Sequence, residues 1–196
     1  MAAEIMSDMD VDWQSVAATM RGPIPDGKTL WYQKHMSHHM EGPISVDDFP
    51  DHSHVFLVRD PDLMVASYRQ KNDLRDAKQL GFERLVEYHG RVSEKMGRPA
   101  PVVDSNRLLA NPERGLHALC QAIGIVWDPA MLSWQKGPHP SDGIWASHWY
   151  NAVWNSTGFG KPTAQSELTM LEQQIADECR PHYDALTRYC INEKFF

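Results

Sequence analysis

HVFLVRDPDLMVASY, residues 54–68, carries the clearest structural signal in this chain. Its apolar run 55–58 is short and unbroken, which is typical of a strand buried on both faces in a parallel sheet. Asp60 can then cap a helix, and Pro61 suits the first helical position because its missing N–H costs nothing there. The stretch therefore predicts a strand, a charged turn and a helix.

The charged turn predicts a ligand site. In open α/β sheets, ligands bind at the carboxyl ends of the strands. Arg59 follows the predicted strand directly, and its guanidinium carries a fork of donors suited to phosphate. Ser67 presents a hydroxyl from the second turn of the helix. In the alternative interpretation, Arg59 pairs with Asp60 or Asp62 and Ser67 is an ordinary helix residue.

The remainder of the chain alternates strands and helices. Further short strands are predicted at 29–33 and 101–104, and helices at 11–20, 77–96, 111–123 and 164–189. Pro181 falls inside the last helix and is expected to kink or split it. The fold class predicted is α/β, with three α/β/α layers around a short parallel sheet, in one domain over residues 1–196.

Composition limits the classes of function. The chain has 196 residues, of which 42% are hydrophobic, enough for a core in one domain. The formal net charge of −7 argues against a nucleic-acid partner. No apolar run is long enough to span a membrane, and the first residues lack the features of a signal peptide. The odd set Cys120, Cys179 and Cys190 predicts reduced thiols in a cytoplasmic protein.

The first candidate for chemistry is Lys34-His35, directly after the strand predicted at 29–33. If that strand and the one before Arg59 are parallel neighbours, His35 and Arg59 share one rim. A neutral imidazole there can accept a proton from a hydroxyl near neutral pH.

The same region raises the alternative of a metal site. His35, His38 and His39 could combine with acidic or histidine side chains further on, at Asp47, Asp48, His52 or His54. Their spacing fits no standard ligand pattern, so no metal is expected.

The second candidate begins at Lys136-Gly137 and continues into SDGIWASHWY, residues 141–150. Lys136 offers an ammonium group, and Gly137 a backbone N–H that can approach a phosphate closely. The alternative is a well-packed aromatic loop in which Trp145, Trp149, Tyr150 and Trp154 belong to the core.

Taken in order, these motifs resemble bacterial sulfotransferase-like proteins bearing Tyr-Gln-Lys-His, Arg-Asp-Pro and Ser-Asp-Gly-x-Trp-x-x-His-Trp-Tyr. Here the motifs are residues 32–35, 59–61 and 141–150, and the resemblance extends from Trp13 to Tyr183. It implies a P-loop hydrolase-like fold and transfer of a sulfuryl group from 3′-phosphoadenosine 5′-phosphosulfate (PAPS) to a hydroxyl or amine of a small molecule.

The resemblance also implies roles for individual residues. His35 is the general base, with Lys34 beside it as a second catalytic residue. The nucleotide is held by Arg59, Ser67, Lys136, Gly137 and Trp145. Two departures from the family pattern weaken parts of this assignment: Lys34 and His35 are adjacent rather than separated by one residue, and Gln135 stands where the family carries arginine.

One part of the family pattern is missing. Sulfotransferases open with a strand and a Gly-rich loop that holds the 5′-phosphosulfate, whereas Gly22-Pro23-Ile24-Pro25 has too few N–H groups to cradle an anion. No Gly-x-x-x-x-Gly-Lys-Ser/Thr motif occurs in the sequence. The chain is therefore expected to be shortened at its N-terminus relative to the family. The sheet edge exposed in this way would be covered by residues 1–20 or by a second copy in a homodimer.

Two other functions stay open from the sequence. One is a non-catalytic nucleotide-binding or interaction protein that keeps the fold, which the missing loop favours. The other is a small-molecule kinase of related fold, which the missing Walker lysine argues against.

Overall fold

The computed structural model describes residues 2–37, 40, 42–140, 142–164 and 167–191. In the described part, the longer elements in chain order are α1 (Ala2–Asp8), α2 (Trp13–Met20), β1 (Phe56–Val58), α3 (Pro61–Tyr68), α4 (Phe82–Met96), β2 (Val102–Asp104), α5 (Ser105–Ala110), α6 (Pro112–Ile123), α7 (Ala146–Trp149), α8 (Asn151–Trp154) and α9 (Met170–Thr187). Short 3₁₀ helices include η1 (Pro25–Gly27), η3 (Val46–Asp48), η4 (Ala77–Leu80) and η5 (Pro129–Leu132).

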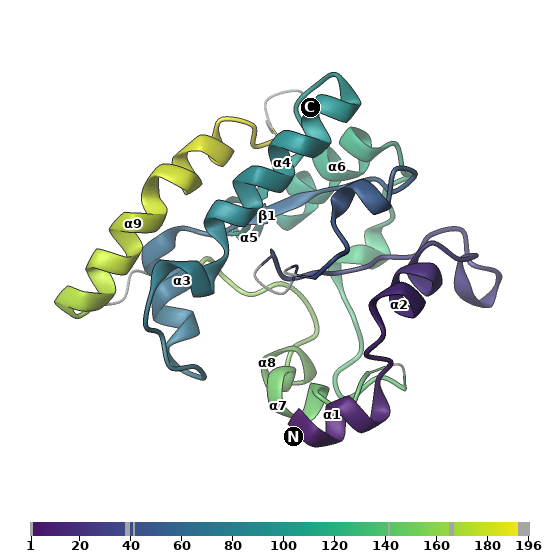
Figure 1. Ribbon diagram of the computed structural model, residues 1–196, viewed down its shortest axis with the longest axis horizontal. Helices are drawn as coiled ribbons and strands as arrows, with labels where there is room; N and C mark the ends of the chain where they lie inside the picture. Colours follow the sequence, from purple (N-terminus) through teal and green to yellow (C-terminus); the bar gives the residue numbers. More distant parts are fainter. Residues whose placement is uncertain (1, 38–39, 41, 141, 165–166, 192–196) are drawn as a thin grey trace.

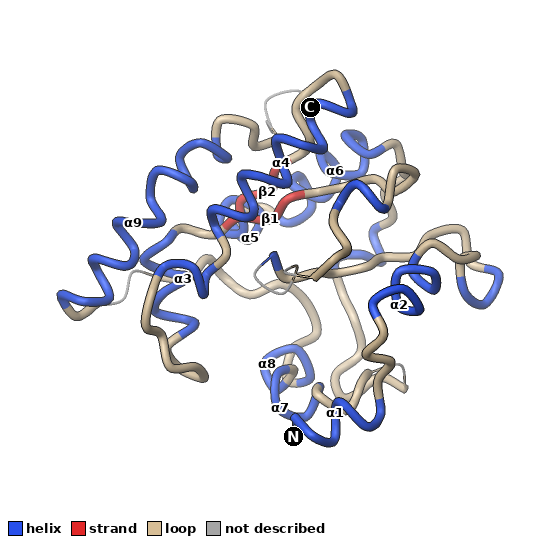
Figure 2. Tube along the Cα trace, viewed as in Figure 1, coloured by secondary structure: helices blue, strands red, loops and turns tan. Residues whose placement is uncertain are grey.

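A short parallel sheet lies at the centre of the helices (Figure 2). β1 and β2 pair in parallel, with Phe56 opposite Val102 and Val58 opposite Asp104. The chain that follows α9 adds to the far side of β2, where the Ile191 N–H donates to the Val102 carbonyl at 2.9 Å. The predicted α/β class with a short parallel sheet is confirmed.

Helices α4 and α9 lie side by side over one face of this sheet (Figure 1). Phe56 and Val58 of β1 pack there with Tyr88 and Val92 of α4 and with Leu186 of α9. Burial of such apolar side chains is the main favourable contribution to folding. The sheet is therefore anchored to the last helix as well as to the helix that connects its strands.

A second apolar cluster joins α9 to α3. It contains Val65 of α3, Phe82 at the start of α4, and Ile175 and Cys179 of α9. On the opposite face of the sheet Leu57 is 56% exposed. Helix α9 thus contributes to both clusters, and the second face of β1 is largely open.

The strand predicted at 29–33 is not formed, because the contacts of this segment come from side chains rather than from a backbone ladder. Gln33 Nε2 donates to the Met20 carbonyl at 3.0 Å, and the same carbonyl accepts from His52 Nε2 at 3.2 Å. Among the described residues, β1 pairs only with β2. A β propensity alone does not make a strand when no ladder partner is available.

Two predicted helices differ in detail from expectation. The helix expected at 77–96 is divided at Gly81, whose φ of 70° is the left-handed conformation that glycine adopts without strain. Pro181 does not split α9, which runs unbroken to Thr187. Pro181 is exposed, so the carbonyl of Asp177, which loses its helical donor, lies on the solvent side.

The three cysteines are free thiols, as predicted. Burial raises the pKa of Cys179 to about 11, so its thiol stays protonated near neutral pH. In the part of the chain described here, no helix is both long and apolar enough to cross a bilayer.

A buried carboxylate connects the sheet to α9 and α5. Asp104 ends β2, where its Oδ1 accepts from the Arg107 N–H at 2.9 Å and so caps α5. Its Oδ2 accepts from the Tyr183 hydroxyl at 2.7 Å. Burial of the phenol, then the hydrogen bond to Asp104 and the negative charges of Asp104 and Asp60, raise the pKa of Tyr183 well above its usual range. Tyr183 is therefore protonated, and a hydrogen-bond donor, near neutral pH.

Replacing Tyr183 by phenylalanine should lower the free energy of unfolding by about 1–3 kcal/mol, because Oδ2 of the buried Asp104 carboxylate loses its donor. Urea unfolding measures the change. Tyr32→Phe is the matched control, since the Tyr32 side chain is 81% exposed. Equal stability of the Tyr183→Phe variant and the parent would contradict this role for the phenol.

A second prediction concerns pH. His89 is buried in α4, and its Nε2 lies 3.1 Å from the Ala100 carbonyl. Burial lowers the pKa of His89 from its ordinary value of 6.5, although the hydrogen bond to Ala100 opposes this. Below pH 6.5 the unfolded chain therefore binds more protons than the folded one, and stability falls as the pH falls.

The expected result is a lower free energy of unfolding at about pH 5.5 than at about pH 7.5. His89→Gln keeps an N–H donor but does not titrate, so its loss over this range should be smaller. His148→Gln serves as control because the His148 side chain is exposed, and it should lose as much as the parent. An equal loss in all three proteins would refute the assignment to His89.

Candidate active site

The turn after β1 is held in place by α9. Asp60 caps α3 by accepting the Asp62 N–H at 2.9 Å, and Pro61 occupies the first helical position as predicted. Arg180 donates to Asp60 Oδ2 at 2.6 Å and to Asp62 Oδ1 at 2.8 Å. Both carboxylates are therefore paired with Arg180, and the alternative in which Arg59 pairs with them is not what the structure contains.

Arg59 extends from this turn at the carboxyl end of β1. Its side chain is half-buried, and Nη2 donates to the Thr163 hydroxyl at 3.1 Å. Burial lowers the pKa of Arg59, yet an arginine remains charged. In the described part of the chain Arg59 has no acidic partner, so a partly desolvated cation is left with a neutral acceptor.

Helix α3 presents two functional faces. On one, Arg69 forms an ion pair with Glu172 and also donates to the Glu167 carbonyl, which binds α3 to the region of α9. On the other lies Ser67, about 200° around the helix from Val65, whereas Met64 packs with Val65 in the cluster that joins α3 to α9. The Ser67 hydroxyl is exposed and has no hydrogen-bond partner among the residues described.

Lys71 lies in the turn that follows α3. Its Nζ donates to the His148 carbonyl at 2.8 Å and lies 5.0 Å from the centre of the Trp149 ring. The cation–π contact and the hydrogen bond together attach α7 to the end of α3.

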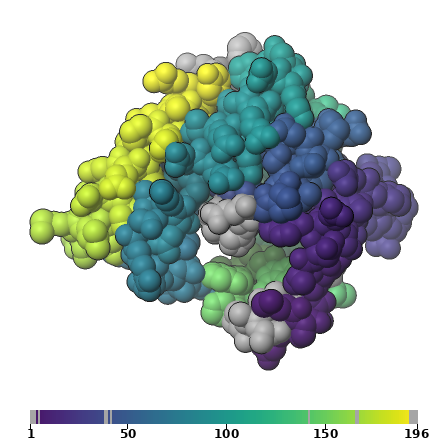
Figure 3. All heavy atoms as spheres, in the orientation of Figure 1, coloured from purple at the N-terminus to yellow at the C-terminus, as the bar shows by residue number. Residues whose placement is uncertain are grey.

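Two contacts thus join α3 to residues 145–163, one near each end of the helix. Arg59 meets Thr163 at the start, and Lys71 meets His148 at the end. The space-filling view shows an opening between the blue-to-teal atoms of α3 and its following loop and the green atoms of the segment around residue 150 (Figure 3). In sequence, Ser67 lies between Arg59 and Lys71, the two residues that make these contacts.

The second candidate segment is held by its own hydrogen bonds. The Gly137 N–H donates to the Trp154 carbonyl at 2.9 Å, and the Trp154 indole donates to Asp142 Oδ2 at 2.8 Å. Lys136 is exposed, and Trp145 is half-buried at the start of α7. The Gly137 amide, predicted to approach a phosphate, is thus already engaged with a carbonyl.

His35 lies between two anchored points of its segment. Gln33 is tied to the Met20 carbonyl, and the Ser37 hydroxyl donates to the Gly81 carbonyl at 3.0 Å, at the start of α4. Since α4 leads from the carboxyl end of β1 back to the amino end of β2, Ser37 is on the carboxyl-end side of the sheet. His35 itself is close enough to His52 and His54, which precede β1, for their charges to affect it, and no contact joins His35 to Arg59 among the described residues. The structure therefore does not bring these two predicted site residues together.

The electrostatics of His35 favour the neutral ring. Partial desolvation, then the positive charges that His52 and His54 carry when protonated, lower the pKa of His35 below its ordinary 6.5. At neutral pH the imidazole is thus free to accept a proton. Lys34 beside it is exposed.

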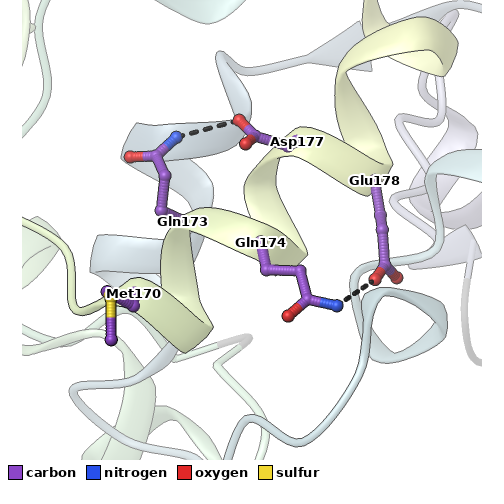
Figure 4. Close-up of a pocket in the computed structure, with 5 residues that line it drawn as sticks. All are labelled: Met170, Gln173, Gln174, Asp177 and Glu178. Atoms are coloured by element: carbon purple, nitrogen blue, oxygen red, sulfur yellow. Dashed lines mark hydrogen bonds between the residues drawn. The ribbon is translucent and has the colours of Figure 1, made fainter.

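Two further regions of the molecule carry no candidate site among the described residues. His38 and His39 lie outside the described residues, and in the described part no three His, Cys, Asp or Glu side chains could hold a metal ion. A shallow polar depression on α9 is lined by Gln173, Gln174, Asp177 and Glu178, and Met170 beside them is 92% exposed (Figure 4). These side chains bind one another along the helix, as Gln173 does Asp177 at 3.0 Å, and offer no cation to a phosphate.

Sequence reasoning missed three residues of this site: Thr163, Lys71 and Arg180. Thr163 lies in an irregular loop, and Lys71 lies past the end of α3, so neither carries a periodic signal. Arg180 lies on the helix predicted at 164–189, but no sequence pattern pairs it with Asp60 and Asp62, which are 120 and 118 residues away.

Two curated relatives from Arabidopsis thaliana match most of this chain. Branched-chain-amino-acid aminotransferase-like protein 2 is 28% identical over 184 residues, covering 93% of this chain and 32% of the relative. Branched-chain-amino-acid aminotransferase-like protein 1 is 30% identical over 186 residues, covering 94% and 31%. The chain thus spans about a third of the length of these relatives. No solved structure gives a significant match.

The family comparison covers nearly the whole chain. The model that matches is described as a sulfotransferase domain, and it aligns with residues 1–188. That range includes both strands, the turn that carries Arg59, and helices α1 to α9. The chain belongs to the sulfotransferase domain family.

Proposed function

We propose that this chain binds PAPS and transfers its sulfuryl group to a hydroxyl or amine of a small-molecule acceptor. The observation that carries the proposal is the opening beside α3. Arg59, which has no acidic partner among the described residues, and the exposed Ser67 hydroxyl both belong to the strand–turn–helix unit on one side of this opening. Such a pair of donors suits a phosphate dianion.

Arg59 and Ser67 would hold the 3′-phosphate of the nucleotide. The guanidinium supplies charge, and its partner Thr163 is neutral, so an anion can replace it at low electrostatic cost. Lys136, Gly137 and Trp145 belong to the segment on the other side of the opening, which Lys71 attaches to α3. We assign that segment to the nucleotide, with Lys136 as its second cation.

The chemistry requires a base for the acceptor. The acceptor oxygen or nitrogen attacks sulfur in line, the bond from sulfur to the 5′-phosphate oxygen breaks, and His35 takes the proton that the acceptor loses. The lowered pKa of His35 keeps its ring neutral and able to do so at neutral pH. Lys34 is the adjacent cation, available to the negative charge that develops on the leaving phosphate.

A second candidate is a protein that binds the nucleotide without turning it over. The Gly137 amide is occupied by a carbonyl, and the sequence carries no Gly-rich loop for the 5′-phosphosulfate. Binding and transfer are therefore tested separately.

The first test is isothermal titration with adenosine 3′,5′-bisphosphate, the desulfated product. Removing the guanidinium in Arg59→Ala should weaken binding about 10- to 100-fold, because charge-assisted hydrogen bonds contribute about 1.5–3 kcal/mol. Arg75→Ala is the control, since Arg75 is exposed and pairs only with Asp73 among the described residues. Unchanged affinity in Arg59→Ala would end the claim for this nucleotide site.

The second test is transfer of radiolabelled sulfate from PAPS to a panel of phenols and amines. His35→Asn should lower the rate about 10²- to 10⁴-fold, the usual contribution of a general base, while leaving bisphosphate affinity within about twofold. Nucleotide binding without any transfer by the parent protein would favour the non-catalytic candidate. Transfer that survives in His35→Asn would remove His35 from the mechanism.

A further inference from the structure

A cavity of about 420 Å³ lies at the opposite end of the sheet from Arg59. His54, just before β1, and Pro101, just before β2, both line it, which fixes its position at the amino ends of the strands. Its volume falls within the range of small-molecule sites. None of the residues assigned to the nucleotide lines it.

The walls of the cavity are largely apolar. They come from η3 and the loop after it, from α4 and from the end of α6, through side chains that include Val46, Phe49, Val92, Met96 and Ile123. Phe49 is 4% exposed and Val92 is 3% exposed, so these walls are fixed by the surrounding core. An apolar group entering the cavity would gain the free energy of burial.

Two permanent cations also line the cavity, Lys95 and Arg98. Lys95 Nζ lies 2.9 Å from Asp47 Oδ1, and Arg91 pairs with both Asp47 and Glu87. The charges of Lys95 and Arg91 are therefore balanced by those of the two carboxylates. Arg98 forms no hydrogen bond or ion pair with any described residue. Arg98 is exposed, so its guanidinium is accessible to an anion that enters the cavity.

Helix ends do not account for Arg98. Helices α4 and α6 both end beside the cavity, at Gly97 and Gly124, and cations near helix C-termini are often there to offset the dipole. That explanation suffices for Lys95, which lies in the last turn of α4. Arg98 lies beyond the helix and bonds to none of its carbonyls among the described residues.

Two imidazoles complete the polar part of the wall. His52 Nε2 donates to the Met20 carbonyl at 3.2 Å, and His54 Nε2 donates to the Phe49 carbonyl at 3.1 Å, because a carbonyl can only accept. In the neutral ring each Nδ1 therefore carries no hydrogen and can only accept, and it becomes a donor when the ring is protonated. Desolvation, then the charges of His52 and Lys95, lower the pKa of His54, although the hydrogen bond to Phe49 opposes this.

We propose that this cavity is a second binding site, for a small organic anion with an apolar body. The phosphate, sulfate or carboxylate group of the ligand binds Arg98, and its apolar part lies against Phe49 and Val92. This site is independent of the proposed nucleotide site, because it uses other residues at the other end of the sheet.

Phenyl phosphate is the probe, followed by isothermal titration and by NMR of the His54 ring. Because the proposed nucleotide site also suits a phosphate, the titrations are made with adenosine 3′,5′-bisphosphate present at saturation. The parent protein should then bind phenyl phosphate saturably with one site at the cavity, and Arg98→Gln should bind it about tenfold more weakly. Arg59→Ala and Arg75→Gln should bind as the parent does. Benzyl alcohol, which has the ring without the charge, should bind more weakly than phenyl phosphate.

The NMR titration gives a readout that affinity alone does not. A bound anion favours the protonated ring, so saturation with phenyl phosphate should raise the pKa of His54. No saturable binding, or equal affinity in Arg98→Gln and the parent, would overturn the proposal. Loss of binding in Arg59→Ala would also overturn it, because the probe would then belong to the nucleotide site. An unchanged pKa of His54 at saturation would overturn it as well, because the probe would then not lie in the cavity.

Discussion

The ion pairs of Arg180 with Asp60 and Asp62 hold the turn on which the candidate site is built. They connect α9 to the first turn of α3, and the two hydrogen bonds are 2.6 and 2.8 Å long. By engaging both carboxylates, Arg180 leaves the adjacent Arg59 without an acidic partner among the described residues. The turn is thereby fixed in position while its arginine stays available to an anion, which is the condition that the proposed chemistry needs.

Helix α3 connects this constraint to the rest of the molecule. Val65 and Arg69 connect it to α9, and Ser67 is exposed on it. Its two ends are tied to the segment around residue 150 through Thr163 and Lys71. A short helix can therefore act as the fixed wall of a site whose other wall is irregular, and irregular segments are common in binding sites.

Local sequence signals predicted the strand, turn and helix of residues 54–68 because apolar continuity, Asp60 and Pro61 each act within a few residues. The segment 29–33 shows the limit of such signals, since its residues favour a strand but a ladder needs a partner. The contacts of Arg59 with Thr163 and of Lys71 with His148 span 104 and 77 residues. Such contacts depend on tertiary packing, which no local pattern records, so the position of the opening could not be predicted.

The most direct measurement is a crystal structure of the chain with adenosine 3′,5′-bisphosphate bound. We expect the 3′-phosphate to lie between the Arg59 guanidinium and the Ser67 hydroxyl, with oxygen atoms within about 3 Å of donors from both side chains. We also expect the pairs of Asp60 and Asp62 with Arg180 to remain in place. A 3′-phosphate bound elsewhere, or Arg59 still directed only at Thr163 with the nucleotide present, would contradict the central claim.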